Sequence, residues 1–190
     1  MVAAAVKAID EGGEQAIRTK AIAEAAGVTE PSVFHFFGNR EGLVQAAQIE
    51  RYKRSLAEMY AAFRDAVARC SSKDEFSGIV RATITMAFTP HRDKERSSRV
   101  SVLGSAVSRP TMRAELVAAQ DASFAALTEA LDRARAEGWL DRDVDGRVFA
   151  AWLAGTSTGR VIAELYEDPE MLQKWNEMTV SSVLHLFGIE

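Results

Sequence analysis

The residue types that carry out catalysis are few in this chain and lie far apart. Three histidines, His35, His91 and His185, occur among 190 residues, and none stands at a recognisable spacing from a paired carboxylate or a nucleophile. There is no glycine-rich phosphate loop. The single cysteine, Cys70, excludes an intramolecular disulfide and gives no metal-ligand spacing. This inventory argues against an enzyme and predicts neither a metal site nor a cofactor, so the chemistry to look for is non-covalent recognition.

The strongest pattern for recognition lies in residues 19–43, TKAIAEAAGVTEPSVFHFFGNREGL. Thr19 is placed to cap a short helix with apolar residues at helical spacing, and Gly27 stands where a left-handed residue ends a helix. Thr29 is a second N-cap candidate, and Pro31 falls in the first turn of the next helix, where its missing N–H costs nothing. Two short helices joined in this way form a helix-turn-helix.

The two helices of this motif need a steep crossing and an inward apolar face. Ala23 is small enough to allow the close approach, and Val33, Phe36 and Phe37 supply the inward face of the second helix. Glu30, at the start of that helix, either accepts a hydrogen bond from a cytosine amino group or caps its own helix, and we favour the cap.

The run of residues resembles the DNA-binding signature of TetR-type transcriptional repressors. The matching positions are Thr19, Ile22, Ala23, Ala26, Gly27, Val28, Thr29, Val33, Phe34, Phe36, Phe37, Arg40 and Leu43. Three of them depart from the usual residues, since the family has Tyr at Phe34, His or Tyr at Phe36, and Lys at Arg40. Phe34 cannot give a phosphate the hydrogen bond that a phenol gives, whereas Arg40 keeps the positive charge.

The resemblance implies a ligand-responsive transcriptional regulator, a repressor, that binds a pseudopalindromic double-stranded DNA operator as a homodimer. A small, mostly apolar effector would release it. Phosphate contacts are expected from Thr19, Lys20 and Arg40, and base contacts from Pro31, Ser32, Phe34 and His35. His35 is alternatively a plain solvent-facing residue. The alternatives for the whole chain are an activator, a sensor of the same fold that does not bind DNA selectively, and, last, an enzyme.

By the same resemblance, the final two helices form the dimer interface. Within residues 145–166, apolar and small residues recur at alternating spacings of four and three, which makes one continuous helix face. The predicted interface comprises Val148, Trp152, Gly155, Gly159, Ile162, Leu172, Trp175, Thr179, Val183 and Leu186. The alternative is that this small-residue face packs inside its own subunit.

The resemblance also implies that the central helices enclose the effector pocket. The predicted lining is Phe63, Phe76, Val80, Met86, Val102, Leu103, Phe124 and Trp152, each of which is alternatively an ordinary core residue. Few charges interrupt this set, which favours a mostly hydrophobic or aromatic effector.

The remaining pattern predicts an all-α protein of about nine helices. An N-terminal three-helix helix-turn-helix domain, residues 1–44, would precede a larger helical effector-binding and dimerisation domain, residues 45–190. Helices are expected at about 1–11, 39–69, 100–107, 108–137 and 145–166, with another from the capping box at Ser72 to Pro90 and a last one starting at Asp168. The charged stretch 91–99, HRDKERSSR, is expected to be a solvated loop, with partner binding as the alternative.

Composition and charge bound the function further. The hydrophobic content of 47% suits a substantial core, and neither a bilayer-length apolar stretch nor a signal peptide is present, so we expect a cytoplasmic protein. The net charge is −4, and residues 1–50 carry four basic against seven acidic residues. This acidity weakens the electrostatic argument for DNA binding and is the only support for the sensor alternative.

Overall fold

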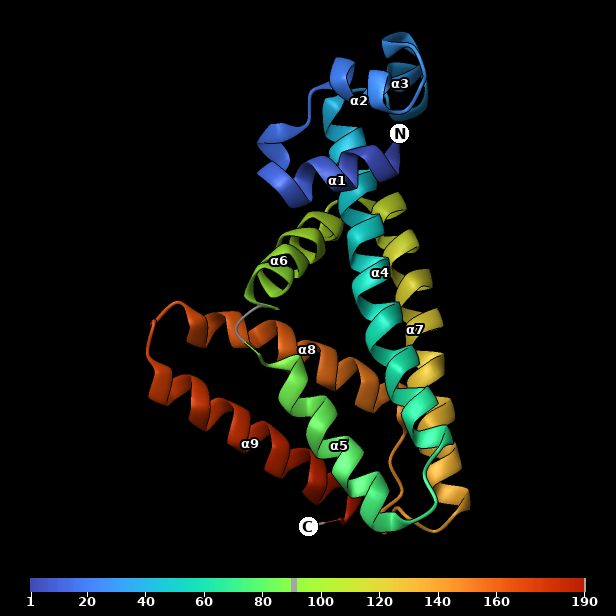
Figure 1. The fold of residues 1–190 in the computed structure, drawn as a ribbon, viewed down its shortest axis with the longest axis vertical. Coiled ribbons are helices and arrows are strands. Elements are labelled where there is room, and N and C mark those ends of the chain that lie inside the picture. The colour runs from blue at the N-terminus through green and yellow to red at the C-terminus, as the bar shows by residue number, and fades with distance from the viewer. Residues whose placement is uncertain (90–91, 190) are drawn as a thin grey trace. The chain divides into compact units, whose positions relative to one another are not determined.

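Helices make up the regular structure of the chain. The computed structural model describes residues 1–89 and 92–189, except for the side chains of residues 55 and 56. The helices are α1 (Val2–Gly12), α2 (Thr19–Ala25), α3 (Glu30–Phe37), α4 (Arg40–Ala68), α5 (Lys73–Ala87), α6 (Asp93–Val107), α7 (Pro110–Ala136), α8 (Gly146–Glu164) and α9 (Pro169–Phe187), with a 3-10 turn η1 (Glu14–Ala16) after α1 (Figure 1). The all-α prediction with about nine helices is confirmed over these residues. None of their helices has both the length and the apolar composition that a bilayer crossing requires.

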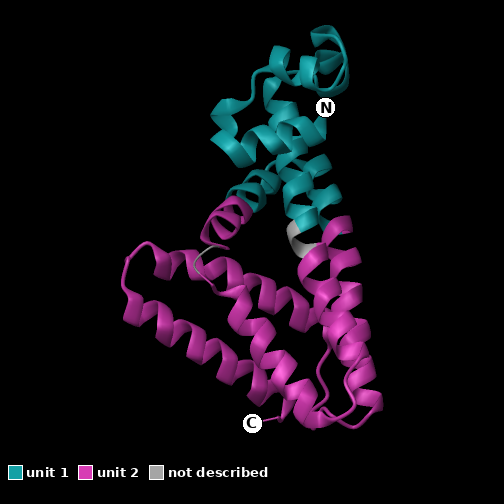
Figure 2. Cartoon of the chain, viewed as in Figure 1, with its two compact units in different colours: residues 1–55, 101–117 teal, residues 56–100, 118–190 magenta. Residues whose placement is uncertain are grey.

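The chain packs as two compact units (Figure 2). Unit 1 comprises residues 1–55 and 101–117, and unit 2 comprises residues 56–100 and 118–190. Helices α4, α6 and α7 therefore each contribute residues to both units. The predicted division into a DNA-binding domain, residues 1–44, and an effector-binding and dimerisation domain, residues 45–190, stays a prediction.

Side-chain caps start several helices at the residues that the sequence predicts. Asp145 and Asp168 accept hydrogen bonds from backbone N–H groups in the first turns of α8 and α9. The Ser72 hydroxyl accepts from the Glu75 N–H at 3.2 Å, and the Glu75 carboxylate accepts from the Ser71 N–H at 2.7 Å. These bonds satisfy N–H groups that have no partner within their own helix, which is why such residues mark helix starts reliably.

The core of unit 1 is built where α1, α2, α3 and the beginning of α4 meet. Its buried members are Ala5, Val6, Ile9, Ile17, Ile22, Ala23, Val33, Leu43, Val44 and Ala47, and Phe37 packs partly buried against them. The buried face of α1 belongs to this cluster, so the first helix braces the helix-turn-helix motif. Burying such a face stabilises a short helix far more than its intrinsic propensity does.

Aromatic residues from distant segments form part of the core of unit 2. Phe76 of α5 lies with its ring centroid 5.9 Å from that of Trp139 and 6.2 Å from that of Phe187 on α9. The Phe149 ring of α8 lies 4.8 Å from Phe187. Helices α5, α8 and α9 are thereby held together by large apolar side chains, each of which contributes about 1.5–3 kcal/mol on burial.

The charged stretch 91–99 is helical from Asp93 onward, so its prediction as a solvated loop is wrong. It forms the first half of α6, and Arg96 within it is fully buried. Pro90, predicted to end the preceding helix, and His91 lie outside the described residues. The error has a physical cause: a run of charges looks solvated when it is counted as a block, whereas a helix turns every third or fourth residue to the same side.

Cys70 lies just beyond the end of α4. Its thiol is buried, and burial raises its pKa above the ordinary value, with the neighbouring Glu75 acting in the same direction and Arg133 and Arg69 opposing it. The reactive thiolate is therefore disfavoured at neutral pH, which argues for a structural cysteine rather than a redox sensor.

Candidate DNA-contacting motif and ligand cavity

Helices α2 and α3 meet at a turn whose backbone ends one helix and starts the next. Gly27 has a φ of +66°, a left-handed conformation that strains residues with a Cβ, and the Val28 N–H donates to the Ala23 carbonyl at 3.0 Å. The Ser32 N–H donates to the Thr29 carbonyl at 3.0 Å as α3 begins. The predicted helix-turn-helix is confirmed.

The inward face of α3 consists of Val33 and Phe37. Val33 is fully buried and Phe37 is partly buried, and because the two residues are four apart they lie on the same side of the helix. Phe36 was predicted to point inward with them, but 67% of its surface is exposed, so that prediction is wrong. The helical repeat rotates Phe36 by about 100° from Phe37, away from the core.

A side-chain hydrogen bond joins the first residues of α2 and α3. The Thr19 hydroxyl donates to the Glu30 carboxylate at 2.5 Å. Thr19 is the first residue of α2 and makes no capping bond, so its predicted role as the cap is wrong. A hydroxyl has one proton to donate, and Thr19 therefore cannot donate to a phosphate while this bond is present. Glu30 accepts this hydrogen bond from Thr19. No side-chain hydrogen bond caps α3, so the expectation that Glu30 caps its own helix is wrong.

Arg40 fastens the motif to the segment that precedes it. Its guanidinium Nε donates to the Ile17 carbonyl at 3.0 Å, and Nη2 donates to the Glu14 carbonyl. These bonds hold the η1 segment against the start of α4. A guanidinium has five N–H groups, so a phosphate contact by Arg40 remains compatible with the two bonds.

Arg40→Ala is expected to lower the free energy of unfolding by about 1 kcal/mol, because two charge-assisted bonds to backbone carbonyls are lost at a partly solvated site. A urea titration followed by circular dichroism measures this loss. Lys20→Ala is the matched control: Lys20 is an exposed cation of the same motif, and its removal should change stability by less than about 0.5 kcal/mol. Equal midpoints for the two variants would show that the Arg40 bonds contribute nothing in solution.

The other predicted DNA contacts are available to solvent. Lys20, Pro31, Phe34 and His35 are exposed, and Ser32 is half-buried, with its hydroxyl 2.8 Å from that of Thr29.

A glycine is required at position 42, near the start of α4, and this requirement was not predicted from the sequence. A Cβ at this position would lie 2.0 Å from the Phe37 carbonyl oxygen, so no other residue fits without moving the end of α3. The Gly42 N–H also donates to the Asn39 side chain at 2.9 Å, so Asn39 caps α4. The available signal was the short interval between the last aromatic residue of α3 and the next helix, which forces the chain to turn tightly.

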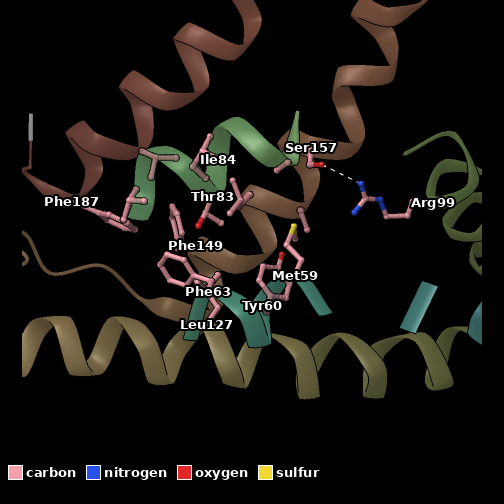
Figure 3. Close-up of a pocket in the computed structure, with 15 residues that line it drawn as sticks. Met59, Tyr60, Phe63, Thr83, Ile84, Arg99, Leu127, Phe149, Ser157 and Phe187 are labelled. Carbon is pink, nitrogen blue, oxygen red and sulfur yellow. Dashed lines mark hydrogen bonds between the residues drawn. The ribbon is translucent and has the colours of Figure 1, made fainter. Parts of the chain in front are cut away.

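Unit 2 contains a mainly apolar cavity between α4, α5, α7, α8 and α9, with α6 contributing one residue (Figure 3). It is lined by Met59, Tyr60, Phe63, Val80, Thr83, Ile84, Ala87, Arg99, Leu127, Phe149, Leu153, Ala154, Ser157, Val183 and Phe187. The volume open to the centre of a water-sized sphere is about 30 Å³, which is room for roughly two water molecules. A larger ligand would have to widen it.

The cavity includes some of the residues that the sequence predicted for an effector pocket. Phe63 and Val80 line it, as expected. Phe76 instead packs in the aromatic core described above, and the Phe124 ring lies edge-on to the ring of Tyr60, 6.0 Å away. Phe76 and Phe124 are therefore ordinary core residues, which was the alternative interpretation for each predicted pocket residue.

Four further predicted pocket residues lie outside the cavity. Met86 is 65% exposed, and Trp152 is at the surface of α8, 40% exposed. Val102 and Leu103 belong to unit 1, whereas every residue that lines the cavity belongs to unit 2. The apolar character of a residue could not show whether it lines a cavity, lies at the surface or packs in another core, because the same residue types occur in all three places.

Charged side chains are buried on α6 and α8, the helices that contribute Arg99 and Ser157 to the cavity. Arg96 and Arg160 are almost completely buried, and both bind Glu164, with the Arg96 Nε 2.6 Å from the carboxylate. Asp93 pairs with Arg96 as well. Arg99 lines the cavity itself, 6% exposed, and sequence reasoning missed it because it fell in the presumed loop.

Much of the predicted dimer face is exposed. Val148, Trp152 and Ile162 on α8 and Leu186 on α9 are exposed, while Leu172 and Trp175 are half-buried. Open space surrounds Gly155 and Gly159, since a Cβ at either would meet no atom within 4 Å. A groove between α8 and α9 is lined by Trp152, Gly155, Thr156, Gly159, Trp175, Met178, Thr179 and Ser182. The alternative, that the small-residue face packs inside its own unit, does not hold for the two glycines.

Two predicted interface residues are buried within the unit instead. Thr179 is 3% exposed and donates its hydroxyl to the Trp175 carbonyl at 2.9 Å. Val183 is fully buried and lines the cavity. Val183 belongs to the side of α9 that packs inward, so its placement at the dimer face is wrong. Thr179 also lines the groove between α8 and α9, and its place at the dimer face stays a prediction.

Comparisons with known proteins agree with this geometry. Residues 1–47 match the model of a family described as bacterial regulatory proteins, tetR family. The fold is similar to that of GusR from Salmonella enterica (20% identity, 98% of this chain and 93% of that one, TM-score 0.61) and of a TetR-family transcriptional regulator from Pectobacterium atrosepticum (19%, 97% and 89%, 0.59). It is also similar to FadR from Bacillus subtilis, solved in complex with stearoyl-CoA (16%, 100% and 97%, 0.56). A comparison with curated proteins found no match.

Proposed function

We propose that the chain is a regulator of the TetR family, a ligand-responsive repressor that binds a pseudopalindromic DNA operator as a homodimer. The observation that carries the proposal is the confirmed helix-turn-helix. Its α3 keeps Val33 in the core while Pro31, Phe34 and His35 remain exposed. A short helix exposed in this way is suited to the major groove, where side chains reach the base edges.

A homodimer is supported by the exposed apolar face of α8 and α9. Single exposed apolar residues are common, but a continuous row of them on one helix marks an interaction surface. A groove between these helices contains Trp152, Gly155 and Gly159, and a second copy of the chain on this face would cover its apolar residues.

Control by an effector is supported by the cavity in unit 2 and by the helices shared between the units. A ligand shifts an equilibrium only by binding one state better than another. A state with a widened cavity is the one an effector would favour, and α4, α6 and α7 continue from unit 2 into unit 1. In the effector-bound state the two reading helices of the dimer would no longer fit successive major grooves.

Two substitutions in the motif test DNA binding with different expected outcomes. Lys20→Ala should weaken binding to all sequences alike and reduce the slope of log affinity against log salt by about 1, because one phosphate contact is lost. Ser32→Ala should change affinity only for operators altered at particular base pairs, by roughly 1–3 kcal/mol. Fluorescence anisotropy with the purified dimer, the DNA upstream of its own gene and a scrambled control of equal length measures both.

The same titration, together with a transcription assay, separates the repressor from the alternatives. If the unsubstituted protein binds the scrambled DNA as tightly as the upstream DNA at every salt concentration, the sensor hypothesis, with its acidic N-terminal region, takes the lead. If it binds selectively but raises transcription in a reconstituted assay, the activator hypothesis replaces repression.

A further inference from the structure

We propose that the cavity in unit 2, once widened, takes a small monocarboxylic acid with a single apolar tail, and that Arg99 binds its carboxylate. The cavity has walls of two kinds. Most of its lining is aliphatic or aromatic, with Phe63, Phe149 and Phe187 among the largest residues. Arg99 and Ser157 form a polar pair, joined by a hydrogen bond of 3.4 Å from Nη2 to Oγ (Figure 3), and Tyr60 and Thr83 also carry hydroxyls.

Burial distinguishes Arg99 from an arginine at the protein surface. Only 6% of the residue is exposed, and a guanidinium keeps its charge at any physiological pH. A cation held in an apolar cavity interacts strongly with an anion, because little water screens the pair. The planar guanidinium also matches a carboxylate geometrically, with two parallel N–H donors for two oxygens.

The apolar wall selects the part of the ligand beyond the carboxylate. The rings of Tyr60, Phe63 and Phe149 are grouped away from the Arg99 side of the cavity (Figure 3). A ligand with its anionic group at Arg99 would therefore extend its apolar part among these rings. A dianion or a sugar would leave charges or hydroxyls buried against aromatic carbons, which costs several kcal/mol for each unpaired group.

The position of Arg99 on α6 gives the carboxylate a route to the DNA-contacting unit. Arg99 is among the last residues of α6 in unit 2, and the same helix continues as residues 101–107 of unit 1. A ligand whose carboxylate binds Arg99 therefore acts directly on a helix that contributes residues to both units. An apolar molecule lacking a carboxylate would fill the same space without that contact.

Matched pairs of probes test the proposal: octanoate against octan-1-ol, and phenylacetate against 2-phenylethanol. Because the proposal rests on the proposed effector role of the cavity, binding is measured by calorimetry on the full chain without DNA, so that a failure of DNA recognition leaves the result unaffected. Each acid should bind at least about tenfold more tightly than its alcohol, the ratio expected when one charge-assisted pair is gained. Equal affinities within both pairs, or no binding by either acid, would overturn the proposal.

Variants of the polar pair assign the effect to its residues. Arg99→Gln should remove the preference for acids while leaving the affinity for the alcohols within about threefold, and Arg99→Lys should retain part of the preference because it keeps the charge. Ser157→Val, which removes only the hydroxyl partner, should reduce the preference and provides a second test where Arg99→Gln does not fold. Folding is checked by circular dichroism. A folded Arg99→Gln protein that still prefers acids tenfold would rule out Arg99 as the binding group.

Discussion

Ile162→Glu is expected to convert the proposed homodimer into monomers and to lower the affinity for operator DNA by a factor of about 10²–10⁴. The factor is the advantage that two linked reading units have over one, because the second half-site is bound at a high effective concentration. The substitution leaves the motif itself unchanged. Its effect on DNA would therefore act entirely through assembly.

The local structure around Ile162 explains why one residue has such an effect. Ile162 is 64% exposed within a unit and lies on the same face of α8 as Trp152 and Gly159, with open space over the glycine. In a twofold symmetric interface the same residue occurs twice, so two glutamates would be buried without partners. The desolvation of two unpaired carboxylates outweighs the apolar area that such an interface gains.

Sedimentation equilibrium measures the assembly, and anisotropy measures DNA affinity on the same preparation. Val117→Glu is the matched control, because Val117 is an apolar residue of α7 that is 47% exposed and outside the predicted interface. The control should remain a dimer with unchanged affinity. A dimeric Ile162→Glu protein, or a monomeric one that keeps full affinity, would contradict the assignment of this face.

The sequence predicts the helices well because their ends carry local signals. The Asp145, Asp168 and Ser72 caps act within three residues of their own positions, and Gly27 stops α2 through its own backbone. Such effects depend little on the rest of the fold. The core position of Val33 was predictable for a similar reason, since it stands six residues after Gly27, where it fills the corner between the two helices.

The cavity could not be predicted in the same way, because its lining depends on packing between distant segments. Val80 and Met86 belong to the same helix and are both apolar, yet one lines the cavity and the other is exposed. Only the contacts of α5 with other helices decide between them. Thr179 and Val183 show the same ambiguity on α9, where one face packs inward and the next faces out.

The misread start of α6 did contain a usable signal. Arg96, Arg99, Val102 and Ala106 follow one another at spacings of three and four, and all are buried. The apolar face of the predicted helix 100–107 thus extends backward through two arginines. If charged residues had been allowed on a buried helix face, this spacing would have predicted a longer helix with Arg99 inside the protein.

Glu164→Gln is expected to lower the free energy of unfolding by about 3–5 kcal/mol, the loss typical when one partner of a buried ion pair is removed. Glu164 is the carboxylate that both Arg96 and Arg160 bind, and both arginines are at least 97% buried. Glutamine keeps the size and one acceptor oxygen but removes the charge. Among the described residues, Asp93, half-exposed on α6, would then be the only carboxylate paired with either arginine.

Thermal and urea unfolding measure the loss, which corresponds to a fall in the melting temperature on the order of 10 °C for a protein of this size. Glu170→Gln serves as the control, because Glu170 pairs with Lys174 at the exposed surface of α9, where such pairs contribute about 0–1 kcal/mol. A loss at Glu164 no greater than at Glu170 would mean that water reaches Arg96 and Arg160 in solution. In that case α6 would be less firmly held against α8, and Arg99 would sit in a more polar cavity than its burial indicates.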